Sequence, residues 1–67
     1  MNYIYENEDG RGASIKHAPS PINKEQCVVC FKFGFTAISM LVVDLQDAIE
    51  RVKAVFGEGI ELVEVDD

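Results

Sequence analysis

The residues with the clearest chemical potential are two cysteines separated by two valines, Cys27 and Cys30. Redox-active Cys-x-x-Cys pairs normally lie at a helix N-terminus, where the helix dipole lowers the pKa of a thiol. The flanking residues here are β-branched and aromatic, which favours a strand. Positions three apart in a strand face opposite sides, so these thiols should point apart and could not easily form a disulfide. The pattern predicts two reduced core cysteines, with redox chemistry or a metal site shared between chains as alternatives.

The single histidine, His17, and the serines give no catalytic arrangement. Tetrahedral zinc needs four ligands, so a site within one chain would need a carboxylate besides His17 and the two cysteines. His17 lies beside a proline-rich segment and is expected on the surface. No spacing brings His17 near a serine, and no carboxylate pair shows the split environment that acid–base catalysis requires. We therefore predict a protein that is not an enzyme and needs no cofactor or metal.

Acidic residues are concentrated in the second half of the chain. Residues 1–33 carry four acids and four bases, whereas residues 34–67 carry eight acids and two bases, so the second half holds the whole net charge of −6. Such a field repels nucleic acid and favours basic protein surfaces. The last ten residues contain no base and five acids, which are the candidate partner-binding residues: Glu58, Glu61, Glu64, Asp66 and Asp67.

This acidic run has two interpretations. Negative side chains on an edge strand block unwanted pairing and keep an apolar chain soluble. Alternatively, they form a docking surface for a basic protein, including one that handles nucleic acid, because carboxylates on a rigid scaffold can imitate phosphates. The second interpretation predicts a small acidic interaction protein or inhibitor that binds no nucleic acid itself.

The chain is short enough for one domain over residues 1–67, and 48% of its residues are hydrophobic. Alternating tyrosine and isoleucine over residues 2–6, then Asp9-Gly10, make residues 1–17 either a hairpin or a mobile arm. Pro19 and Pro21 mark residues 18–24 as a surface connection.

Residues 25–67 predict a core with the order ββαβ. The first strand, residues 25–33, has one apolar face expected in the core: Cys27, Val29, Phe31 and Phe33. The second, residues 35–43, is apolar on both faces, which is typical of a central strand. Asp44 suits the N-cap of a helix that ends at Phe56, and residues 60–65 predict a last strand. The expected fold is α+β, a small antiparallel sheet of three to five strands with one helix on one face.

Two further expectations concern assembly and location. One helix can cover only one face of residues 35–43, so a second copy is expected to cover the other, giving a homodimer or a homo-oligomeric structural module. No signal peptide is expected, because residues 1–10 are polar and acidic. Lys32 and Gly34 interrupt the most apolar run, so no membrane span is expected. Free thiols suit a reducing cytoplasm.

Overall fold

The computed structural model describes residues 2–65 and contains one sheet and one helix. The elements are β1 (Asn2–Glu6), β2 (Gly12–His17), β3 (Cys27–Phe33), β4 (Thr36–Val42), α1 (Leu45–Phe56) and β5 (Val63–Val65). The five strands form an antiparallel sheet in the order β4-β3-β2-β1-β5. The predicted α+β class is confirmed. The order ββαβ predicted for residues 25–67 is that of β3, β4, α1 and β5, but it does not match the whole chain, in which four strands precede the helix.

The N-terminal hairpin, β1 and β2, belongs to the sheet, and β2 is the central strand of the sheet. Gly10 takes a positive φ of 76° in the turn, and the Asn7 side chain accepts hydrogen bonds from the amides of Asp9 and Arg11 at 2.9 and 3.1 Å. Gly12 starts β2 where a Cβ atom would overlap the carbonyl oxygen of Tyr5. A glycine is therefore required for β1 and β2 to approach each other there.

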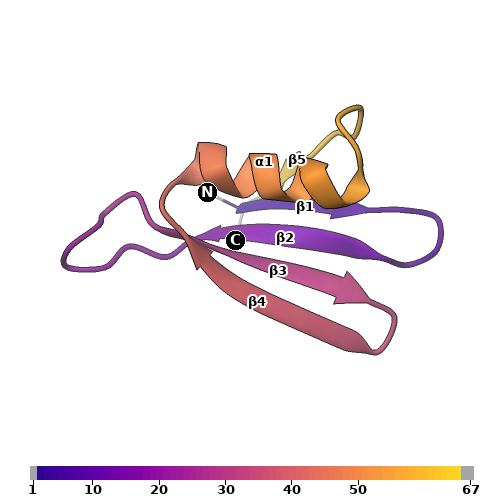
Figure 1. Cartoon of the computed structure of the whole chain (residues 1–67), viewed down its shortest axis with the longest axis horizontal. Helices are drawn as coiled ribbons and strands as arrows, with labels where there is room; N and C mark the ends of the chain where they lie inside the picture. Colours follow the sequence, from indigo (N-terminus) through magenta and orange to yellow (C-terminus); the bar gives the residue numbers. More distant parts are fainter. Residues whose placement is uncertain (1, 66–67) are drawn as a thin grey trace.

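The connection between β2 and β3 is an ordered loop that projects from one end of the sheet (Figure 1). Ser20 and Asn23 exchange backbone hydrogen bonds and form an isolated bridge. Asn23 also donates its side-chain amide to the carbonyl oxygen of Val43 at 2.9 Å, which ties the loop to the end of β4. The predicted proline-containing connection is thus closed by its own hydrogen bonds.

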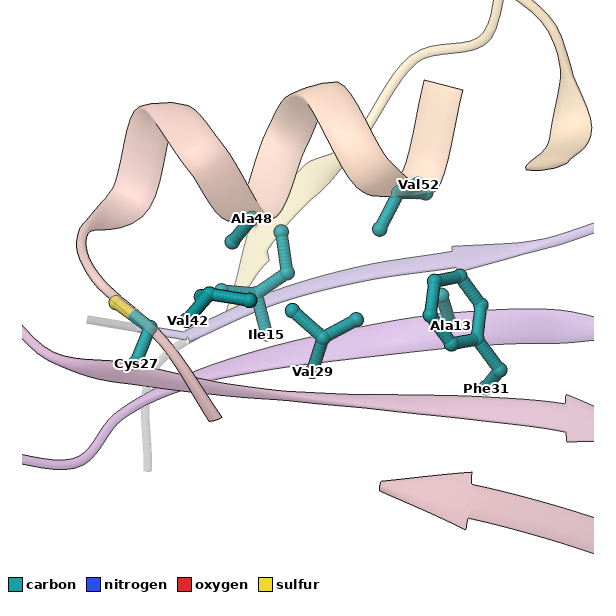
Figure 2. Packing of buried hydrophobic residues seen from close by; sticks show 8 residues of the cluster. All are labelled: Ala13, Ile15, Cys27, Val29, Phe31, Val42, Ala48 and Val52. Carbon is teal, nitrogen blue, oxygen red and sulfur yellow. The ribbon is translucent and has the colours of Figure 1, made fainter. Parts of the chain in front are cut away.

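The core lies between α1 and one face of the sheet (Figure 2). Alternate residues of β2, β3 and β4 point toward the helix, in agreement with the face predicted for β3. The buried apolar side chains are Ala13, Ile15, Cys27, Val29, Phe31, Val42, Ala48 and Val52. Phe56 at the end of α1 completes this core through ring contacts with Tyr5, Phe31 and Phe33.

The helix begins as predicted at an Asp44 N-cap, whose carboxylate accepts the amide of Asp47 at 2.8 Å. Asp47 then pairs with Arg51 one turn later, at 3.3 Å. The chain leaves α1 at Gly57, whose amide donates to the carbonyl of Lys53. Gly57 has φ 116° and ψ 152°, so the helix does not end in the left-handed helical cap that a glycine after its last residue favours, although a positive φ is present.

β4 is an edge strand, which contradicts the central position predicted from its two apolar faces. Of its residues only Val42 is buried, and Met40 is half-buried. Because the N-terminal hairpin extends the sheet sideways, it covers neither β4 nor the face opposite α1 (Figure 1). The apolar side chains that suggested a central strand therefore remain in contact with solvent in one copy of the chain.

Within residues 2–65, the structure has no helix with the length and apolar content needed to cross a membrane.

Candidate functional site: the acidic edge

The acidic C-terminal segment forms the edge of the sheet opposite β4. Ile60 and Leu62 pack against the core and hold the segment between α1 and β5. β5 then pairs with β1, with Val63 opposite Ile4 and Glu64 opposite Tyr3. The predicted strand of residues 60–65 is shortened to three residues, so Glu61 precedes the ladder.

Three of the five candidate acids lie within the described residues, and all three are exposed: Glu58, Glu61 and Glu64. Asp66 and Asp67 lie outside the described residues. In the part of the chain that the structure describes, the one ion pair joins Asp47 and Arg51, so these three carboxylates have no cationic partner there. The edge therefore presents a negative field that is not neutralised within the described chain.

The fold also brings one acid of the first half, Glu6, toward this edge. β5 runs antiparallel to β1, so the segment that enters β5 approaches along Tyr5 and Glu6. The Tyr5 and Phe56 rings lie 5.1 Å apart, which places the end of α1 at the same end of β1. Glu6 is exposed there. Charge counting along the sequence treats residues 1–33 as neutral, and it missed this approach because strand pairing, not sequence distance, sets the neighbours.

The two cysteines lie on opposite faces of β3, as the strand pattern predicts. Cys27 is 1% exposed and faces α1 (Figure 2). Its Sγ atom lies 3.5 Å from the carbonyl oxygen of Glu25. Burial raises the pKa of the Cys27 thiol, and the charges of Asp44 and Glu25 raise it further. Cys30 is half-buried on the face away from the helix. This arrangement disfavours a disulfide and gives Cys27 little thiolate character.

His17 is opposite Cys27 in the pairing of β2 with β3, which sequence spacing could not show. Its Nε2 atom lies 2.7 Å from the carbonyl oxygen of Lys24, and the side chain is exposed. The pairing does not make an activated cysteine, because the Cys27 pKa is raised and not lowered. Within residues 2–65, no three His, Cys, Asp or Glu side chains are grouped to hold a metal ion.

A shallow hollow of about 180 Å³ lies on the sheet face opposite α1. Its lining includes Gly12, Ile4, Ser14 and Cys30. Glu6 and Lys32, which lie on either side of Gly12 in the sheet, stand at its rim. The hollow is mostly apolar, so it could take a small apolar side chain, and sequence analysis did not predict it.

Comparison with known proteins gave no significant match to a family model, to a curated protein or to a solved structure.

Proposed function

We propose that this chain is a non-enzymatic interaction protein that binds a larger protein with a basic surface through its acidic C-terminal half. The observation that supports this proposal most directly is a set of exposed carboxylates between the end of α1 and β5 that have no cationic partner within residues 2–65: Glu58, Glu61 and Glu64. Asp66 and Asp67 continue the acidic sequence. A lysine- or arginine-rich surface would find several uncompensated charges on one small scaffold.

The partner class follows from the chemistry of carboxylates held along a folded edge. Spaced negative groups resemble the phosphates of a nucleic acid, so a protein that handles nucleic acid is a suitable target and inhibition a suitable outcome. The chain itself should not bind DNA or RNA, because its net charge of −6 has the wrong sign. We place this interaction in the cytoplasm, where two free thiols would stay reduced.

The test starts with an affinity pull-down and mass spectrometry to identify the partner, followed by binding kinetics at low and high salt. Glu61→Lys combined with Glu64→Lys should slow association strongly, because it reverses charge at the proposed surface. Glu25→Lys combined with Glu50→Lys makes the same change in net charge at exposed positions outside the candidate binding residues of the segment 58–67, and it should have a small effect. Glu6 and Glu8 are unsuitable controls, because they lie at and just after the end of β1, the strand that pairs with β5 at the acidic edge.

Equal affinities for the two charge reversals, without salt dependence, would overturn the proposal and leave the acidic run as a solubility feature. Both substitutions should leave the fold intact, because Glu61 and Glu64 are exposed. Circular dichroism of each variant checks this point before kinetics are measured.

We also propose that the chain forms a homodimer. The supporting observation is that one helix covers one face, while β4 and the opposite face have no cover among the described residues. The alternative of a redox or metal protein gains no support from the geometry, since Cys27 and Cys30 lie on opposite faces of β3.

A further inference from the structure

β4 has an unpaired edge with unusual side chains for that position. Four of the exposed large hydrophobic residues lie on β4 or directly beside it: Phe35, Ile38, Leu41 and Val43. Phe35 is fully exposed, and the other three are at least half exposed. No charged residue, proline or glycine occurs between Phe35 and Val43. Edge strands usually carry such residues to prevent pairing with another chain, and β4 lacks them.

We propose that β4 pairs antiparallel with β4 of a second copy, about a two-fold axis at Ser39. The two five-stranded sheets would then form one continuous sheet with both helices on the same face. This inference gives the proposed homodimer a defined interface, and it does not depend on the acidic edge.

The backbone of β4 is suited to this pairing. The β3–β4 turn has two residues, Gly34 with a positive φ of 66° and then Phe35, which fits the type II′ turn of a tight hairpin. Such a turn closes on a hydrogen-bonded pair, here Phe33 and Thr36. Hydrogen-bonded and non-bonded pairs alternate along the ladder, so the free N–H and C=O groups of Ala37, Ser39 and Leu41 point outward.

Ser39 is the midpoint of β4, so a two-fold axis there gives the longest ladder. Ala37 would pair with Leu41 of the second copy, and Ser39 with its own equivalent. The same symmetry pairs Leu41 with Ala37 of the second copy, so three pairs supply about six hydrogen bonds between the chains. The ladder ends at Leu41, because the carbonyl oxygen of Val43 already accepts the Asn23 side chain.

The same axis makes the side chains complementary. On the helix face, Ile38 lies opposite Met40 of the second copy. On the other face, the large Leu41 lies beside the small Ala37, with Ser39 at the axis. Phe35 is brought toward Val43 beyond the ladder. Every exposed apolar group of this strand therefore gains an apolar neighbour from one symmetry operation, which lowers its contact with water.

Charge also favours a second copy at this edge over one at the open face or at β5. The open face carries Lys16, Lys32 and Glu6, whereas residues 34–43 carry no charge. β5 is only three residues long and has an acid at its centre, Glu64. Two identical acidic chains approach with least repulsion where neither has a charge, and β4 is that place.

The test measures molar mass by sedimentation equilibrium of the whole chain and of single-residue variants. The wild type should approach twice 7.5 kDa at high micromolar concentration. Ser39→Lys and Ser39→Asp should each be monomeric, because the axis places like charges side by side, whereas an equimolar mixture of the two should regain the dimer. Val63→Lys is the matched control on the opposite edge, since Val63 is 59% exposed, and it should remain dimeric.

Amide hydrogen exchange tests the same interface in the wild type without mutation. The amides of Ala37, Ser39 and Leu41 should become protected as concentration rises, while those of β5 should not. A monomeric wild type would overturn the homodimer altogether. A dimer that survives Ser39→Lys, or that forms without new protection in β4, would overturn this interface and place the contact on the open face or at β5.

Discussion

Cys27 shows how the fold determines the behaviour of a single side chain. Its thiol is buried below the start of α1, and burial is the main cause of its raised pKa, followed by the negative charges of Asp44 and Glu25. A free cysteine has a pKa of about 8.5 in an unfolded chain. Between that value and the higher value in the folded protein, the folded state keeps a proton that the unfolded state has lost. The free energy of unfolding must therefore fall as pH rises through this window.

We predict that the urea midpoint of the wild type is lower at pH 9.5 than at pH 7.5 because of Cys27. Cys27→Val removes the titrating group from the core and should make the midpoint less sensitive to this change in pH. Cys30→Val is the control, because Cys30 is only half-buried and on the other face, and it should keep the wild-type sensitivity. The same drop in all three proteins would show that other groups cause it.

Sequence predicted much at this scale and missed specific contacts. The alternation in β3 identified the core face correctly, because a strand places every second side chain on one side. It could not show that His17 lies opposite Cys27, since the register of β2 and β3 depends on the length and turn of the loop between them. Nor did it show that Gly12 lines a hollow, because that requires knowing that β1 lies beside β2.

At the scale of elements, α1 stabilises the sheet through a narrow stripe of side chains. Ala48 and Val52 are fully buried against the sheet, whereas Val55 is half exposed. Val55 follows Val52 by three residues, a helical spacing that alone would place both on one apolar stripe. The structure shows that it lies at the margin of the stripe, because α1 contacts β2 and β3 most closely and the sheet does not extend beneath every apolar position.

We predict that Val52→Ala lowers the free energy of unfolding by about 1–3 kcal/mol, from lost apolar burial and the cavity that remains. Val55→Ala removes the same atoms from the same helix at a half-exposed position, and its effect should be much smaller. Urea unfolding of both variants measures the difference. Equal losses of stability would show that the helix is packed on the sheet with a different rotation.

Strand order was less predictable than the strands themselves. The helix cap and the α+β class follow from local patterns, whereas the local pattern at the N-terminus left a hairpin and a mobile arm as alternatives. The edge position of β4 does not, because its two apolar faces are typical of a strand covered on both sides. If β4 pairs with a second copy, it becomes an interior strand of a larger sheet. The pattern would then describe the assembly correctly and one copy incorrectly.

At the scale of the whole molecule, the two edges of the sheet have opposite character. The β4 edge is apolar and uncharged, and the β5 edge is acidic. The molecule measures 37 × 24 × 24 Å. The electrostatic screening length is about 10 Å at 0.1 M salt and about 30 Å at 0.01 M salt. At low salt, charges on one side of the molecule therefore act across most of its length. Salt should therefore affect the two proposed interactions in different directions.

Binding of a basic partner should weaken with salt, because opposite charges attract. Self-association should instead strengthen, because two chains of net charge −6 repel each other and salt screens that repulsion. We predict that the dimer dissociation constant falls several-fold between about 0.01 M and about 0.3 M salt, measured by sedimentation equilibrium.

Glu25→Lys combined with Glu50→Lys tests the physical cause of this salt effect. Each substitution replaces a negative charge with a positive one and so raises the net charge by two, which takes the net charge of the double variant from −6 to −2 without altering β4. The variant should dimerise more tightly than the wild type at low salt and respond less to added salt. If its salt response equals that of the wild type, charge repulsion is not the cause. If dimerisation of the wild type weakens with salt, the chains are held together by ion pairs, which the uncharged β4 edge cannot supply.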